Sequence, residues 1–133
     1  MKKRIPQLLV ALLIAVTYLS AADITGIWTG TQQGRRGETE DVSFRFRVEG
    51  TTLTGKMFGD EFDIPVEEAT LVGDQVRFVV ITRNYYSGSN TKFVYSGTVT
   101  GSSMTLVRER IQTPEEKAAN KPVVTQTLKL KRL

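Results

Sequence analysis

Hydrophobic and polar residues alternate along most of the chain from about residue 26 onward. The clearest run is VSFRFRV at 42–48, which places an apolar side chain at every even position. Period-two alternation predicts antiparallel strands with one buried and one solvated face. We expect eight strands, at about 26–33, 42–49, 53–58, 61–71, 75–83, 91–99, 103–110 and 123–132.

A short repeat marks three of the turns between these strands. An apolar residue, one spacer, a glycine, two spacers and another apolar residue recur with the glycine at Gly50, Gly73 and Gly101. Glycine readily takes the positive φ that tight hairpins require. Gly59-Asp60 predicts a fourth tight turn.

The turns predict the register, because residues paired across a hairpin share a face. The expected pairs are Val48–Leu53, Phe46–Gly55, Phe44–Met57, Met57–Phe62, Gly55–Ile64, Leu71–Val76, Ala69–Phe78, Val99–Met104 and Gly97–Leu106. In each pair an apolar or small residue meets another, so the four turns agree on one buried face.

The fourth strand changes parity near Pro65, and Glu67 and Glu68 follow. A β-bulge that absorbs one extra residue is expected there. We interpret the two glutamates as solvated side chains of this bulge rather than as a catalytic carboxylate pair.

Eight consecutive antiparallel strands with one apolar face predict an all-β fold, namely an up-and-down barrel. Closure into a barrel removes exposed edge strands. A two-sheet β-sandwich is the alternative.

The first 22 residues have the pattern of a secretory signal peptide. Basic residues at 2–4 precede an apolar run at 8–19, and small residues follow at 20–22. The apolar run is too short for a stable membrane-spanning helix. We therefore expect a signal peptide at 1–22, a single domain at 23–133, and a periplasmic or extracellular location. An uncleaved N-terminal anchor is the alternative.

Charge and cysteine content narrow the classes of partner. The chain holds 18 basic and 14 acidic residues, but three of the basic ones lie at 2–4. The remaining 15 against 14 form no basic excess, so we expect no nucleic-acid partner. The lack of cysteine excludes disulfides and lipoprotein processing.

Two short motifs at the ends of the domain resemble a known superfamily. Gly26-x-Trp28 opens the first predicted strand, and Arg132 closes the last. This arrangement resembles the calycin superfamily of lipocalin-like and avidin-like barrels. The resemblance implies that the Gly-x-Trp motif packs near a basic residue of the final strand. Arg132 is therefore expected to stack over Trp28 as a cation–π pair.

A longer pattern, Gly26-x-Trp28-x-Gly30 with a later Leu-Thr-Gly at 53–55, is similar to a group of short secreted bacterial domains. Their relatives can occur near sugar-active enzymes. No ligand residue of the lipocalins and no biotin-site pattern carries over to this chain.

Hairpin order assigns every loop to one of two barrel ends. The turns near 50, 73 and 101 gather at one end, and the loops at 34–40, 59–60, 84–90 and 111–122 gather at the other. Function is commonly located on such loop-rich ends. The candidate ligand-binding residues there are Arg35, Arg36, Asn84, Tyr85, Tyr86, Asn90, Tyr95, Arg108 and Arg110.

Two of these candidates follow from register. Arg108 and Arg110 share the face of Met104 and Leu106, so they are expected to point into the barrel mouth. Guanidinium groups beside Tyr and Asn suit a carboxylate, a phosphate or a sugar. The alternative is that a bulge turns them outward or that loop carboxylates neutralise them. Many aromatic side chains fill the interior, which favours a shallow site over a deep lipid cavity.

The outer face carries adjacent apolar residues on neighbouring strands. Val79, Ile81, Val94 and Val107 all have outward parity. Such a patch indicates a partner surface or self-association. Cover from the 111–122 loop, whose start at 113–117 predicts a short helical turn, is the alternative.

The residue types for common catalytic chemistry are missing. No histidine or cysteine exists in the chain, so the usual general base, a thiolate nucleophile and common transition-metal sites are excluded. We expect no catalytic residues, no metal and no cofactor. The leading hypothesis is a non-catalytic extracytoplasmic binding or accessory module for a sugar, a small anionic molecule or a protein. The alternatives are a self-associating structural protein and a carboxylate-based hydrolase.

Overall fold

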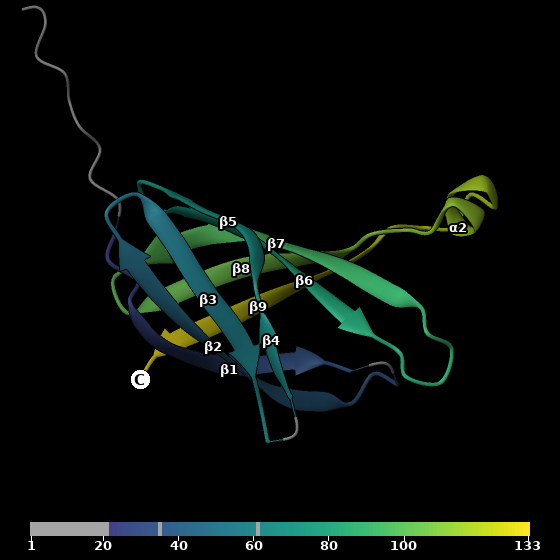
Figure 1. The fold of residues 1–133 in the computed structure, drawn as a ribbon, viewed down its shortest axis with the longest axis horizontal. Coiled ribbons are helices and arrows are strands. Elements are labelled where there is room, and N and C mark those ends of the chain that lie inside the picture. Colours follow the sequence, from purple (N-terminus) through teal and green to yellow (C-terminus); the bar gives the residue numbers. More distant parts are fainter. Residues whose placement is uncertain (1–21, 35, 61) are drawn as a thin grey trace, which may run out of the picture.

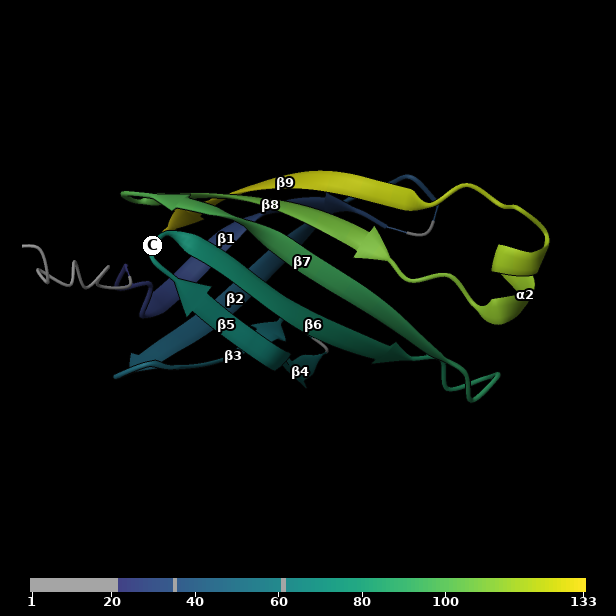
Figure 2. The same ribbon diagram turned by 90° about the horizontal axis from the view of Figure 1, so that it is seen from above.

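The computed structural model describes residues 22–34, 36–60 and 62–133. They form one antiparallel sheet that curls into a nearly closed barrel (Figures 1 and 2). The strands are β1 (Gly26–Gln33), β2 (Thr39–Glu49), β3 (Thr52–Phe58), β4 (Asp63–Pro65), β5 (Glu67–Val72), β6 (Gln75–Arg83), β7 (Asn90–Thr100), β8 (Ser103–Arg110) and β9 (Val124–Arg132). The described helix, α2 (Pro114–Ala118), lies between β8 and β9.

The strand order confirms the all-β barrel over the sandwich. Except for β4 and β5, neighbours in the chain are neighbours in the sheet, and β1 pairs with β9 to join its two halves. The sheet ends at β4 on one side and β5 on the other, and β5 lies against β3. Val66, between β4 and β5, donates its N–H to the Gly55 carbonyl of β3 at 2.9 Å. The barrel is therefore completed at the junction between β3 and β5.

The predicted register holds at the three glycine turns. Gly50, Gly73 and Gly101 adopt φ values of 62°, 61° and 60°, which disfavour any residue with a Cβ. The confirmed pairs are Val48–Leu53, Phe46–Gly55, Phe44–Met57, Leu71–Val76, Val99–Met104 and Gly97–Leu106.

The register predicted at Gly59-Asp60 is wrong by two residues. Met57 pairs with Ile64, not with Phe62, and Gly55 does not pair with Ile64. The turn is longer than expected because the Gly59 N–H donates to the Phe62 carbonyl at 3.0 Å. The Phe62 ring also packs on Gly59 so closely that an added Cβ would lie 2.5 Å from it. A shift of two preserves parity, so Ile64 still faces the core.

The expected bulge in the fourth strand is present and divides that strand into β4 and β5. The β5–β6 register is irregular between Glu67 and Thr70, and Glu68 adopts φ 51°. Ala69 therefore has no regular partner in Phe78, which corrects that predicted pair. This division accounts for nine strands where eight were expected.

Aromatic rings fill the half of the barrel near the glycine turns. Phe78 stacks on Tyr95 at 4.9 Å between centroids, and Phe44 meets both rings edge-on at 5.3 and 5.5 Å. Trp28 and Ile24 are fully buried, and the Trp28 indole N–H donates to the Ile24 carbonyl at 3.0 Å. Residues 22–25 thus plug the end of the barrel that we call the closed end.

Arg132 stacks over Trp28 as predicted. Its guanidinium carbon lies 4.6 Å from the indole centroid, and the two residues are paired across β1 and β9. Its two terminal nitrogens donate to the carbonyls of Thr25 at 2.8 Å and Asp23 at 2.7 Å. The arginine therefore holds the plug against the last strand.

Candidate ligand-binding pocket

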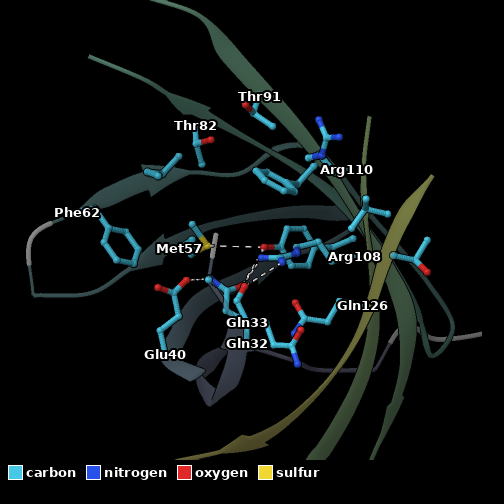
Figure 3. A pocket seen from close by; sticks show the side chains of 16 residues that line it. Gln32, Gln33, Glu40, Met57, Phe62, Thr82, Thr91, Arg108, Arg110 and Gln126 are labelled. Carbon is cyan, nitrogen blue, oxygen red and sulfur yellow. Dashed lines mark hydrogen bonds between the residues drawn. The ribbon is translucent and has the colours of Figure 1, made fainter. Parts of the chain in front are cut away.

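A cavity of about 570 Å³ lies at the opposite, open end of the barrel, where the long loops gather (Figure 3). This volume lies within the range of typical small-molecule sites. Its floor reaches Tyr95 and Met57, whose side chains adjoin the aromatic filling of the closed end. The barrel is thus filled in one half and hollow in the other.

The inner face of the barrel changes from apolar to polar where the strands reach this cavity. Each strand keeps its alternation, but the last inward-facing positions carry polar groups in place of core residues. We call these side chains the polar ring: Gln32, Glu40, Thr82, Thr91, Arg108 and Gln126. The ring draws on β1, β2, β6, β7, β8 and β9.

The remaining sector of the cavity is apolar. Met57 from β3, Phe62 from the β3–β4 turn and Ile64 from β4 line it, and Phe93 of β7 lies among the polar residues. We call Met57, Phe62, Ile64 and Phe93 the apolar wall. The cavity therefore offers a ligand both hydrogen-bonding groups and apolar surface.

Arg108 is the central cation of the polar ring. Its Nη1 donates to the Gln32 Oε1 at 3.0 Å, its Nη2 donates to the Gln33 carbonyl at 3.2 Å, and its guanidinium lies 5.0 Å from the Phe93 centroid. No carboxylate of the described residues lies within ion-pair distance of it. Because a guanidinium has five N–H donors, Arg108 keeps donors for a further group.

Arg110 points to the same mouth but is neutralised. It forms a two-pronged ion pair with Glu116 of α2, in which Arg110 Nη1 lies 3.0 Å from Glu116 Oε1. Arg110, with help from the Thr113 backbone N–H, lowers the pKa of Glu116 to about 2. This is the outcome that the sequence left open as neutralisation by a loop carboxylate.

Helix α2 is the short helical turn that the sequence predicted. Thr113 caps it, with its side chain accepting from the Glu116 N–H at 3.2 Å while Glu116 reaches back to the Thr113 N–H at 3.3 Å. This reciprocal capping box and Pro114 define where the helix begins. Figures 1 and 2 show α2 beyond the open end of the barrel, away from the outer face that it was considered to cover.

Gln126 is the least satisfied member of the ring. It lies opposite Arg108 in the β8–β9 register, and its Oε1 is buried without a hydrogen-bond partner among the described residues. An unpaired buried acceptor costs roughly 1–3 kcal/mol. Its position at the cavity gives the protein a polar group that a bound donor can satisfy after the amide rotates.

Tyr95 supplies the floor with a polar atom. Its ring is fully buried, and its hydroxyl donates weakly towards Gln32 Oε1 at 3.4 Å and Met57 Sδ at 3.9 Å. Burial raises the pKa of Tyr95, and the charge of Arg108 partly offsets this effect. The hydroxyl is therefore a neutral group at neutral pH.

The predicted site residues divide into two groups. Tyr95, Arg108 and Arg110 line the cavity, whereas Arg36, Asn84, Tyr85, Tyr86 and Asn90 do not, and Arg35 falls outside the described residues. The Tyr85 and Tyr86 side chains are 92% and 103% exposed. Asn84 builds its loop, since its Oδ1 accepts from the N–H groups of Tyr86 and Ser87.

The residues that sequence reasoning missed are Gln32, Glu40, Thr82, Thr91 and Gln126. The signal was available in the alternation of each strand. Gln32 continues the inward series of Trp28, and Gln126 continues that of Leu128. Alternation extended to the open end of every strand, and not of the 103–110 strand alone, predicts the whole polar ring.

The outer apolar positions form an interrupted surface. Val79 is 1% exposed, whereas Ile81 and Val107 are 37% and 42% exposed and Val94 is half-buried. In the register, Ile81 lies opposite Lys92 and Val107 lies opposite Ser96, so polar residues separate the two exposed side chains.

Among the described residues, no three histidine, cysteine or acidic side chains are grouped to hold a metal ion. Nor does this part of the chain contain a helix long and apolar enough to cross a membrane. Fold and cavity together define a small antiparallel β-barrel with a pocket at its loop-rich end. Neither a family model, nor a curated protein, nor a solved structure matches the chain.

Proposed function

We propose that the chain is a non-catalytic binding module that takes a small molecule into the open end of the barrel. The observation that carries this proposal is the polar ring around Arg108, a cation whose partners are an amide and a carbonyl. A barrel that served only as a scaffold would gain more stability from apolar side chains at these inward positions. A ligand that hydrogen-bonds the polar ring and covers the apolar wall would supply both the missing hydrogen bonds and the missing apolar burial.

The proposed ligand bears an acidic or strongly accepting group and an apolar part. Guanidinium groups bind carboxylates through paired hydrogen bonds, and Arg108 is held in place by Phe93 and Gln32. The apolar wall argues against a wholly polar sugar, and the aromatic filling below Tyr95 argues against a long lipid chain.

Native mass spectrometry of the gently purified protein tests the proposal. We expect a small molecule to co-purify with the wild-type chain. Arg108→Gln should lose this molecule, or rebind it with an affinity at least about tenfold lower than that of wild type. Arg83→Gln is the matched control, because Arg83 is an exposed arginine at the same end of the barrel that does not line the cavity. A ligand retained equally by both variants would place binding elsewhere and refute the proposed site.

We also propose that the module works in the periplasm or outside the cell and is related to the calycin barrels. The signal-peptide pattern supports export. The Trp28–Arg132 stacking and the closure of β1 on β9 support the relationship. Self-association through the outer face remains the second candidate, and its support is the exposure of Ile81 and Val107.

A further inference from the structure

The cavity holds two opposite charges at a fixed separation. Gln32, only 7% exposed, lies between them: its Nε2 donates to Glu40 Oε1 at 3.0 Å and its Oε1 accepts from Arg108 Nη1 at 3.0 Å. Figure 3 shows Glu40 and Arg108 on either side of this amide. One amide group and two hydrogen bonds therefore keep the carboxylate and the guanidinium apart.

The two charges at this mouth do not neutralise each other. Long side chains on facing strands are able to meet and neutralise each other, as Arg110 and Glu116 do. Here Gln32 occupies the direct path, so neither charge is paired with the other. Glu40 keeps its second oxygen, and Arg108 keeps N–H donors, without a partner among the described residues.

Glu40 is exposed at the mouth of the cavity, yet its parity along β2 is inward. It continues the inward series of Val42 and Phe44, whereas its neighbour Asp41 points outward with Ser43. A carboxylate in this position repels an anionic ligand. It is favourable only to a ligand that also brings a cation or several donors.

We infer that the pocket binds a compact zwitterion with an apolar side chain, the chemistry of an α-amino acid such as phenylalanine. This inference rests on the proposed function and specifies its ligand. The carboxylate of the ligand contacts Arg108, its ammonium contacts Glu40, and its side chain lies on the apolar wall of Met57, Phe62, Ile64 and Phe93.

The arrangement selects by repulsion as well as by attraction. A simple acid binds Arg108 but is repelled by the carboxylate of Glu40. A simple amine binds Glu40 but is repelled by the guanidinium of Arg108. Only a molecule that carries an acidic group and a cationic group close together pairs with both Arg108 and Glu40. A fatty acid or an inorganic anion pairs with Arg108 and leaves Glu40 without a partner of opposite charge.

Three matched probes test this inference by isothermal titration calorimetry with the full mature chain. They are L-phenylalanine, N-acetyl-L-phenylalanine, which lacks the cation, and L-phenylalaninamide, which lacks the anion. We expect phenylalanine to bind at least about tenfold more tightly than either derivative, since each lost charge-assisted hydrogen bond has roughly that effect.

Two variants test which residue recognises which charge of the ligand. Glu40→Gln should abolish the preference for phenylalanine over the N-acetyl derivative, and Arg108→Lys should reduce the preference over the amide, because it keeps the charge but loses the planar fork. Asp41→Asn is the control for Glu40: it removes the same charge one residue away on the outer face. Thermal unfolding of every variant verifies that it is folded.

The outcomes separate this inference from the proposal on which it rests. If the N-acetyl derivative binds as tightly as phenylalanine and Glu40→Gln changes nothing, the zwitterion is refuted while an acid-binding pocket stands. The same holds if none of the probes binds but a co-purified ligand that lacks an ammonium group is lost on Arg108→Gln. If no probe binds and no ligand depends on Arg108, both ideas are refuted.

Discussion

Arg132 joins three separate pieces of the closed end: the ring of Trp28 and the carbonyls of Asp23 and Thr25. We predict that Arg132→Ala lowers the free energy of unfolding by about 2–4 kcal/mol, because it removes one cation–π contact and two charge-assisted hydrogen bonds. Arg132→Lys should lose less, since it keeps the cation but not the fork. Urea denaturation measures both, and equal losses would contradict the role given to the fork.

Tyr95 gives the buried floor a defined pH response. Because burial raises its pKa above the ordinary value of 10.0, the folded state favours the neutral phenol. The stabilising contribution is therefore complete below about pH 10 and is lost as the pH rises through the folded-state value. In urea denaturation, wild type should lose stability relative to Tyr95→Phe only as the pH rises above about 10. Stability curves of the two proteins that stay parallel above pH 10 would contradict this role of Tyr95.

The bulge between β4 and β5 carries a strained residue. Glu68 has φ 51°, a conformation that costs a residue with a Cβ about 1–2 kcal/mol. Glu68→Gly should thus leave stability unchanged or raise it by up to about 1 kcal/mol, after the greater chain entropy of glycine is counted. Glu67→Gly is the control and should destabilise. If thermal unfolding shows Glu68→Gly to be less stable than Glu67→Gly, the backbone strain assigned to Glu68 is wrong.

Helix α2 is attached to the barrel chiefly through the Arg110–Glu116 pair. The pKa of Glu116 falls to about 2, so the attachment is present above the unfolded value near 4.5 and is lost as the pH falls towards 2. We predict that the protection of amides in residues 111–123, taken relative to the intrinsic exchange rate at each pH, is lower at pH 2 than at pH 5. At pH 5 it should also be lower in Glu116→Gln than in wild type. Glu115→Gln, which removes an exposed charge one residue away, should behave as wild type.

At the level of elements, alternation and glycine positions predicted most of the strands, because both reflect local backbone chemistry. The error at Gly59 arose from a contact between side chain and backbone, the Phe62 ring on Gly59, which turn residues alone do not reveal. The candidate site was predicted for Arg108 and Arg110, where alternation was followed to the strand end. Tyr85 and Asn84 were candidates because of their residue type alone, and residue type does not show which way a loop side chain points.

For the whole molecule, binding and self-association predict different masses in solution. The exposed apolar residues of the outer face are separated by polar ones, so we expect a monomer in analytical ultracentrifugation and no change with Val107→Asp. A wild-type dimer that this variant dissociates, without unfolding the barrel, would favour the self-associating alternative.

Export makes a further prediction at this scale. If the signal peptide is cleaved as the sequence indicates, the intact mass of protein recovered from the periplasm corresponds to a chain that starts at Asp23. A mass that includes residues 1–22 would support the N-terminal anchor.

The closure of the barrel by β1 and β9 also has a consequence for biosynthesis. Arg132 and Thr25, which hydrogen-bond each other, are 107 residues apart in the chain. A ribosome adds roughly 5–20 residues per second, so β1 exists for seconds before its second partner strand is made. During that time the aromatic half of the interior has no complete wall. The growing chain therefore exposes apolar surface to the chaperones that bind unfinished polypeptides.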